Sequence, residues 1–372
     1  MTTAARSHAL DGLRGWLAVV VCIYHGILIP DPNQVARIIM VPLQDLSGAH
    51  DVVTKFFFTL LNGDLAVTIF FIMSGAVLHG SLRHLGDGNV ASTGVSFLVK
   101  RILRIYPALV AALMLFWAAM SGFAAVMPSV VQVYFTPGQL LENMLLWKIS
   151  MYGAAWTLQV EMLAVPFIFG AMWLYSRLGL LGLWLAVGYG LLAAESNLFT
   201  FGLPRINGAL LAFAMGMLVP TTVGEILAKG LKPRDWAGIT LMMVFGRMWL
   251  PYAAYSGMVL QTLLGFILVA IIFWQRSAGL ERALTTRSSL FLGHVSYSFY
   301  LLNPIALELL LRIIGSLTGY PPARVDRGLL LGLLATLSTL PVALLCTRFI
   351  EIPGMQLARR LTAPLQTRRR LA

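Results

Sequence analysis

Arg14 and His25 lie in one apolar segment near the N-terminus, a setting in which ionisable side chains need an explanation. His25 follows Arg14 by eleven positions. In an α-helix this spacing leaves the two side chains within roughly 20° of each other on one face and about 16 Å apart along the axis. Because a neutral imidazole can accept a proton from a hydroxyl, this stripe predicts proton-transfer chemistry. For this helix alone, a snorkelling arginine and a hydrogen-bonded core histidine are the simpler explanation.

Glu161 is a second ionisable residue inside an apolar segment, at residues 154–175. A charged side chain at mid-bilayer costs at least ~2.5–3.5 kcal/mol on insertion scales, so it needs a partner. A carboxylate here is predicted to orient His25 and to stabilise its imidazolium, as carboxylates do for general bases. An internal ion pair with Arg14 or Arg247 is the structural alternative. We therefore take His25, Glu161 and Arg14 as the candidate catalytic residues.

Other polar residues in apolar segments are candidates for lining a substrate pocket. Ser296, Tyr300 and Asn303 share one helical face and form a polar stripe. Tyr297 fits this pocket or an aromatic belt at the membrane interface. Ser74 fits the pocket or simple close packing of helices. The candidate pocket-lining residues are Asp11, Ser74, Tyr297, Tyr300 and Asn303.

A dense basic cluster of Lys100, Arg101 and Arg104 precedes an apolar segment. Arg101 and Arg104 lie about one helical turn apart, and this fork is suited to the phosphates of a charged cytoplasmic cofactor. The excess of Lys and Arg in cytoplasmic loops explains the cluster equally well. The three cations are the candidate cofactor-binding residues. Cys22 and Cys346 both lie in apolar runs without metal-ligand spacing, so no metal site is predicted.

The composition indicates which elements must position these residues. Apolar residues make up 58% of the 372 residues and charged residues 11%, whereas soluble domains carry roughly 25% charged residues. The formal net charge of +12 comes from residues between the apolar runs and not from one basic face. This pattern excludes nucleic-acid binding and is typical of a membrane topology signal. The chain is predicted to be an integral membrane protein surrounded by a lipid bilayer.

Ten apolar segments approach the length of about 20 residues that a membrane helix needs. They lie near residues 10–29, 58–79, 107–127, 154–175, 179–194, 205–220, 236–253, 257–275, 293–315 and 327–349. Residues 62–64 are expected to break the second segment and Pro304 to kink the ninth. We therefore expect an all-α, polytopic fold of about ten transmembrane helices, with one domain at 1–353 and a basic cytoplasmic tail at 354–372.

The distribution of basic residues predicts the orientation. With the N-terminus in the cytoplasm, 18 of the 27 Lys and Arg residues fall in inside segments, six in outside segments and three within helices. An excess of positive charge on the inside is the general rule for membrane proteins. Both termini are therefore predicted to be cytoplasmic, and the protein is expected to be a multi-pass protein of the inner membrane.

Six sequence blocks, taken together, resemble the membrane acyltransferase-3 family. In order they are residues 10–15 with His25, 63–75, 100–107, 156–161, 296–301 and 351–353. The resemblance implies transfer of an acyl group, usually acetyl from acetyl-CoA, to a hydroxyl of a surface polysaccharide or related glycan. It also implies that Arg14 and His25 are the family's basic-residue-to-histidine pair and Glu161 its conserved carboxylate. His25 then acts as a general base or as an acyl carrier.

Asn303 is a departure from the family pattern, and it bears on the mechanism. The family commonly has a second histidine at this point, whereas here Asn303 stands directly before Pro304. If that histidine moves a proton, this protein relies on His25 alone or is specialised differently. A transporter or flippase that uses His25, Glu161 and Arg14 as a substrate or proton pathway is the alternative function. The sequence shows neither an inverted repeat nor paired broken helices to favour it.

Overall fold

Helices form all of the regular structure. The computed structural model describes residues 8–82, 85, 90–126, 135–200, 202–203, 206–249, 255–318 and 324–370. It is 87% helical, and its described residues contain no strand. A lipid environment favours this outcome because a helix satisfies its backbone hydrogen bonds within one segment. The predicted all-α, polytopic fold is confirmed.

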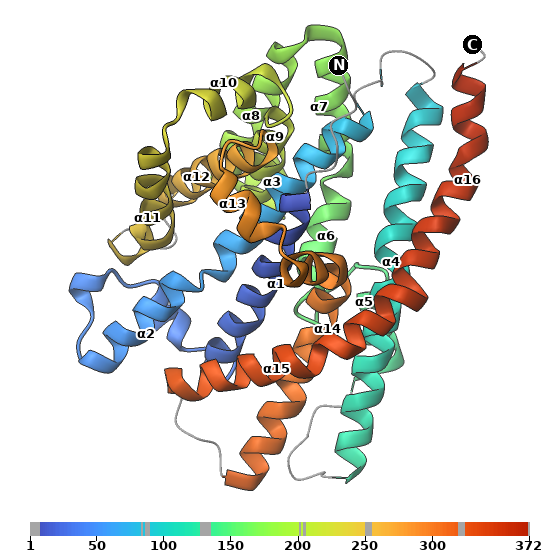
Figure 1. Cartoon of the computed structure of the whole chain (residues 1–372). Helices are drawn as coiled ribbons and strands as arrows, with labels where there is room; N and C mark the ends of the chain where they lie inside the picture. Colours follow the sequence, from blue (N-terminus) through green and yellow to red (C-terminus); the bar gives the residue numbers. More distant parts are fainter. Residues whose placement is uncertain are drawn as a thin grey trace.

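Figure 1 shows the arrangement of the helices. The first half of the chain forms α1 (His8–Leu28), α2 (Ala49–Leu60), α3 (Gly63–Leu82), α4 (Val90–Val126), α5 (Pro137–Met144), α6 (Ala155–Leu163), α7 (Val165–Leu178) and α8 (Leu180–Glu195). The second half forms α9 (Asn207–Leu218), α10 (Thr222–Gly230), α11 (Pro233–Trp249), α12 (Tyr255–Phe273), α13 (Ala278–Leu284), α14 (Arg287–Thr318), α15 (Val325–Cys346) and α16 (Ile352–Arg370). Short helical segments η1 (Val35–Ile39), η2 (Leu43–Asp45), η4 (Asn197–Thr200) and η6 (Thr347–Glu351) connect some of them.

Each of the ten predicted segments falls on a helix, but fewer of these helices are suited to cross a membrane. In the described part of the chain, seven helical stretches are long and apolar enough, or eight if α9 and α10 form one span with a bend of 82°. The 16 residues of α8 and the 17 of α11 fall short of the roughly 20 that a span needs. Residues 250–253 of the seventh predicted segment lie outside the described residues.

The predicted break between residues 62 and 64 separates α2 from α3. Asn62 begins the new helix, because its Oδ1 atom accepts a hydrogen bond of 3.0 Å from the backbone N–H of Leu65. This is the role of an N-cap residue, which satisfies a backbone donor that the first turn of a helix leaves free. Asp64 is thereby held in the first turn of α3.

The α1 helix lies against α14, α15 and α3. Glycines allow the closest approach: a Cβ atom on Gly15 would stand 2.4 Å from the backbone nitrogen of Gly293 in α14. At the other end of α1, a Cβ atom on Gly26 would stand 2.6 Å from the backbone nitrogen of Gly332 in α15. Small residues at helix contacts are a general feature of membrane helix packing. They fix both ends of the helix that carries Arg14 and His25.

The segment predicted as a tail, residues 354–372, continues as helix α16 to Arg370. Figure 1 shows α16 beside α4 along one flank of the molecule, and the two helices are in contact. A Cβ atom on Gly354 would stand 2.8 Å from the carbonyl oxygen of Leu103 in α4. Ala358 and Thr362 are buried. The first part of the segment is therefore packed helix.

Candidate functional site

His25 lies in the last turn of α1 and is half-buried. Its Nδ1 atom is 2.8 Å from the carbonyl oxygen of Val21. A carbonyl oxygen can only accept a hydrogen bond, so Nδ1 must carry the proton. In the neutral imidazole the Nε2 atom then holds the free lone pair. This is the tautomer that a general base acting through Nε2 requires.

Asp64 lies at the contact between α1 and α3. The ring of Tyr24 lies against Gly63, where a Cβ atom would stand 2.6 Å from the Tyr24 Cδ1 atom. His25 and Asp64 are the residues that directly follow Tyr24 and Gly63 in the two helices. From the sequence, Asp64 was expected only at a helix break, and no role was predicted for it. The sequence did contain a signal for a role, because a carboxylate close to an N-capping Asn lies here in an otherwise apolar segment.

Two cations, Arg247 and Lys55, line the same small pocket as Asp64. Arg247 of α11 donates a hydrogen bond from its guanidinium to Oε1 of Gln261. Lys55 of α2 is buried and donates to the carbonyl oxygens of Ile38 and Ile39 at 3.2 and 2.7 Å. Because these carbonyls end η1, the ammonium group of Lys55 acts as a cap for that segment. We name Tyr24, His25, Lys55, Asp64 and Arg247 the His25 layer.

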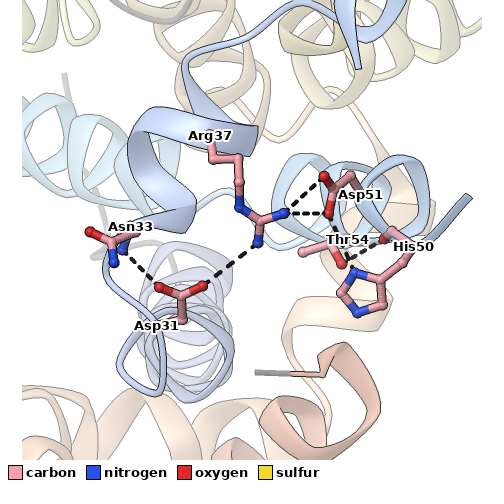
Figure 2. A network of polar contacts seen from close by, with 6 residues as sticks. All are labelled: Asp31, Asn33, Arg37, His50, Asp51 and Thr54. Atoms are coloured by element: carbon pink, nitrogen blue, oxygen red, sulfur yellow. Dashed lines mark hydrogen bonds and ion pairs between the residues drawn. The ribbon is translucent and has the colours of Figure 1, made fainter. Parts of the chain in front are cut away.

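The connection between α1 and α2 closes over the His25 layer. Figure 2 shows Arg37 of this connection between Asp31, which follows α1, and Asp51 in the first turn of α2. The Arg37 Nη1 atom lies 2.8 Å from Oδ1 of Asp51. Ile38 and Ile39, next to Arg37 in the chain, belong to one apolar cluster with Tyr24. The ion pairs of Arg37 thus help to hold this apolar cluster at the end of α1 that carries His25.

Arg14 lies at the opposite end of α1. Its Nε atom donates a hydrogen bond of 3.1 Å to Oγ of Ser296 in α14, and its Nη2 atom lies 3.5 Å from Oδ1 of Asp11. Ser296 Oγ in turn donates to the carbonyl oxygen of Gly293. Arg14 and Asp11 are therefore a partly exposed pair that ties α1 to α14.

Glu161 pairs with Arg101 and not with His25. The Nη2 atom of Arg101 lies 3.1 Å from Oε2 of Glu161, and the hydroxyl of Ser74 donates to Oε1 at 3.4 Å. Ser74 follows Asp64 by ten positions in α3, a separation of about 15 Å along the helix axis. Glu161 therefore pairs with Arg101 and not with Arg14 or Arg247, the two partners that the sequence had offered as alternatives. Tyr297, next to Ser296, bonds to the carbonyl oxygen of Ile105 in α4, the helix of Arg101. We therefore name Asp11, Arg14, Ser74, Arg101, Glu161 and Ser296 together the Arg14 layer.

The three basic residues of α4 differ in their surroundings. The Arg101 side chain is only 8% exposed, whereas Arg104 is exposed and Lys100 is half-buried. Lys100 also lies within electrostatic reach of Arg359 in α16. The predicted fork of Arg101 and Arg104 therefore does not present two free guanidinium groups. Arg104 and Lys100 remain at the surface.

The tyrosines of α14 bond to neighbouring helices. The Tyr297 hydroxyl donates to the carbonyl oxygen of Ile105 in α4 at 2.8 Å. The Tyr300 hydroxyl lies 3.0 Å from Oγ1 of Thr157 in α6, and its ring contacts Phe70 of α3 at a centroid distance of 6.3 Å. Tyr300 thus joins α3, α6 and α14 in the region between the two layers.

Asn303 satisfies the backbone around Pro304. Proline has no N–H group, so the carbonyl oxygen of Tyr300 loses its helical partner. The Nδ2 atom of Asn303 donates to this oxygen at 3.0 Å and to the carbonyl oxygen of Phe299 at 3.1 Å. The Tyr152 hydroxyl donates to the next carbonyl, that of Leu301. Asn303 is buried, and its amide is directed to its own helix.

The site as described consists of an imidazole with a defined tautomer and a second polar layer about 16 Å away along α1. Within the described residues, no group of three or more His, Cys, Asp and Glu side chains could hold a metal ion. An arrangement of this kind can accept and return a proton and can hold an anionic group at its other end.

Comparison with known proteins gives the chemistry to which this arrangement belongs. A family model of acyltransferase-3, described as an acyltransferase domain, matches residues 7–348, nearly the whole chain. No curated protein and no solved structure gives a match. The match includes both layers of the site and ends before α16. The chain belongs to the acyltransferase-3 family and is a membrane acyltransferase.

Proposed function

We propose that this acyltransferase moves an acetyl group from cytoplasmic acetyl-CoA to a hydroxyl of a surface polysaccharide or another glycan, with His25 as the general base. The observation that carries the proposal is the 2.8 Å bond between His25 Nδ1 and the carbonyl oxygen of Val21. It leaves Nε2 as the acceptor for the proton of an incoming hydroxyl. The family supplies the reaction class, and the tautomer of His25 supplies the base.

The proposed donor path runs from the Arg14 layer to the His25 layer. Arg104 is exposed and Lys100 half-buried at one end of this path, where they can bind the phosphates of CoA. With the N-terminus in the cytoplasm, as the basic residues predict, this end opens to the cytoplasm. The pantetheine arm would follow α1 past Arg14 for about 16 Å and present the thioester to His25.

The partly buried pair of Arg101 and Glu161 has a role other than the phosphate binding that was expected for Arg101. Its charges already neutralise each other at 3.1 Å, so neither residue offers a full charge to the donor. We propose that the pair, together with Ser74, forms one wall of the donor path and holds α3, α4 and α6 in register. Tyr297 and Tyr300 form the facing wall on α14.

The reaction balances with His25 alone as proton carrier. The acceptor oxygen forms a bond to the acetyl carbonyl carbon while its proton moves to Nε2 of His25. The carbon–sulfur bond of the thioester breaks, and the CoA thiolate takes the proton back from the imidazolium. In the alternative sequence Nε2 attacks the thioester carbonyl carbon, the carbon–sulfur bond breaks and CoA leaves as the thiolate. The acceptor oxygen then bonds to the acetyl carbon, the nitrogen–carbon bond breaks, and the hydroxyl proton goes to the thiolate, so that His25 returns to its starting form.

Transfer of labelled acetyl groups tests the proposal. Purified protein in liposomes is given [14C]acetyl-CoA and a polysaccharide extract of its source cells. We expect label in the glycan as an ester that hydroxylamine releases. Uptake or flipping of glycan without acetyl incorporation would contradict the proposal and indicate transport. Label trapped on His25 with donor alone would support the acetyl-imidazole sequence, and its absence during normal turnover would support direct transfer.

A further inference from the structure

A small polar pocket in the His25 layer has no role in the function proposed above. Its lining includes Tyr24 of α1, Lys55 and Thr59 of α2, Asn62, and Asp64 of α3, and its volume is about 10 Å³. A cavity needs roughly 10–15 Å³ to hold one water molecule. The pocket therefore has room for one hydroxyl group and not for a sugar ring, an acetyl group or a phosphate.

Two polar groups of this pocket have fewer hydrogen-bond partners than they can use. The Oδ2 atom of Asp64 is buried and has no partner among the described residues. Lys55 is only 3% exposed, and its ammonium group has three N–H donors. Two of them reach the carbonyl oxygens of Ile38 and Ile39 at 3.2 and 2.7 Å, and no other described residue accepts from the third. Buried polar groups of this kind call for an occupant that the protein chain does not supply.

A hydroxyl group is suited to both of these positions. Its oxygen can accept a hydrogen bond from the ammonium group of Lys55, and its hydrogen can be donated to Oδ2 of Asp64. If the carboxyl group of Asp64 holds a proton, the same hydroxyl oxygen can accept that proton's hydrogen bond. The fit therefore does not depend on the charge of Asp64.

The pocket lies next to the surroundings of His25. Tyr24 lines the pocket, and its ring makes an edge contact with the imidazole of His25 at a centroid distance of 5.4 Å. The same ring is held against Gly63, where a Cβ atom would stand 2.6 Å from the Tyr24 Cδ1 atom. A molecule that is held by one hydroxyl in the pocket is thereby anchored close to the imidazole.

We propose that this pocket binds a second, non-reacting hydroxyl of the acceptor glycan, with Lys55 as the donor to its oxygen and Asp64 as the partner of its hydrogen. The inference rests on the acetyl transfer proposed above. It narrows the acceptor to a polyol in which a free hydroxyl neighbours the one that is acetylated. Lys55 and Asp64 bind and orient this acceptor, and neither takes part in the bonds that form and break.

Asp64→Leu tests the inference, because it fills the pocket with methyl groups and removes the unpartnered oxygen. The variant in liposomes is given [14C]acetyl-CoA and increasing amounts of the polysaccharide extract. We expect the KM for the polysaccharide to rise about 5- to 30-fold, while the KM for acetyl-CoA stays within about twofold. Asp326→Leu, which changes an exposed aspartate in the first turn of α15, is the matched control and should leave both KM values unchanged.

Thermal unfolding in detergent separates binding from a structural role. The Oδ2 atom of Asp64 has no partner to lose among the described residues, so Asp64→Leu should unfold at the wild-type temperature or above it. Should Asp64→Leu not insert into the membrane, Asp64→Ala decides, because it removes the carboxyl group without filling the pocket. The same rise in the KM for the polysaccharide is then expected, and an unchanged KM overturns the inference.

The outcomes separate the inference from the proposed function. If Asp64→Leu transfers acetyl with the wild-type KM for the polysaccharide, the pocket holds water only; the inference is then wrong and the proposed function stands. A rise in the KM for acetyl-CoA in place of that for the polysaccharide also overturns the inference. If the wild-type protein places no label in the glycan, the proposed function fails, and the inference fails with it.

Discussion

Asn303 donates a hydrogen bond of 3.0 Å to the carbonyl oxygen of Tyr300, the carbonyl that Pro304 leaves without its helical partner. This relationship explains the Asn-Pro sequence in α14. The resemblance described above led us to expect a second histidine at this position, but Asn303 stands there and its amide is directed to backbone oxygens. The proton transfer proposed for His25 therefore needs no contribution from Asn303.

Asn303→Ala should lower stability by about 1–3 kcal/mol, because it leaves a buried carbonyl oxygen unsatisfied. Pro304→Ala restores an N–H group to the helix, so Asn303→Ala should be less costly in that background. Thermal unfolding of the two single variants and the double variant in detergent measures the coupling. Additive losses would show that Asn303 does not act on the carbonyl that Pro304 frees.

Arg101 and Glu161 should be energetically coupled. Removal of either charge leaves the other without its partner and should lower the free energy of unfolding by about 2–3 kcal/mol. This loss is smaller than the roughly 3–5 kcal/mol expected for a fully buried pair, because Glu161 is 22% exposed. Arg101→Met with Glu161→Gln should then be more stable than either single variant. Unfolding midpoints of the three variants check this expectation. A double variant less stable than both singles would contradict the pairing.

Arg104 should act on donor binding. Arg104→Ala is expected to raise the KM for acetyl-CoA roughly 5- to 30-fold, the equivalent of about 1–2 kcal/mol for one phosphate contact, with a smaller effect on kcat. Arg177→Ala, an exposed arginine of α7 next to Trp173, is the matched control. Equal KM values for both variants would leave Arg104 with a topological role only.

Gly63 should be required for the contact between α1 and α3. Gly63→Ala introduces a Cβ atom 2.6 Å from the Tyr24 ring, which must shift and take the adjacent His25 with it. We expect a lower acetyl-transfer rate in this variant. Gly80→Ala in the same helix meets no atom within 4 Å and should leave the rate unchanged. Similar rates for the two variants would show that the Tyr24 contact does not position His25.

The sequence was sufficient to predict the helices and the break at residues 62–64, because both follow from local apolar runs and an N-capping Asn. It did not show which of the helices reach membrane length. The bend between α9 and α10 and the short α8 depend on packing between helices. The family was readable because its motifs keep their order along the chain.

The partners inside the site were less predictable. Glu161 was expected beside His25 on the basis of residue type, but the fold brings Arg101 to Glu161. This contact joins residues 60 positions apart in the sequence, and no periodicity within one helix predicts it. The hydrogen bonds of Asn303 depend on the adjacent Pro304. The sequence shows this proline but does not indicate the direction of the Asn303 amide.

Acetyl transfer by His25→Ala tests the central claim most directly. The variant is reconstituted beside wild type and His294→Ala, an exposed histidine of α14, and all three are given [14C]acetyl-CoA with the polysaccharide extract. We predict that His25→Ala inserts normally and loses at least about 100-fold in rate, whereas His294→Ala retains the wild-type rate. Wild-type transfer by His25→Ala would contradict the assignment of His25 as the base.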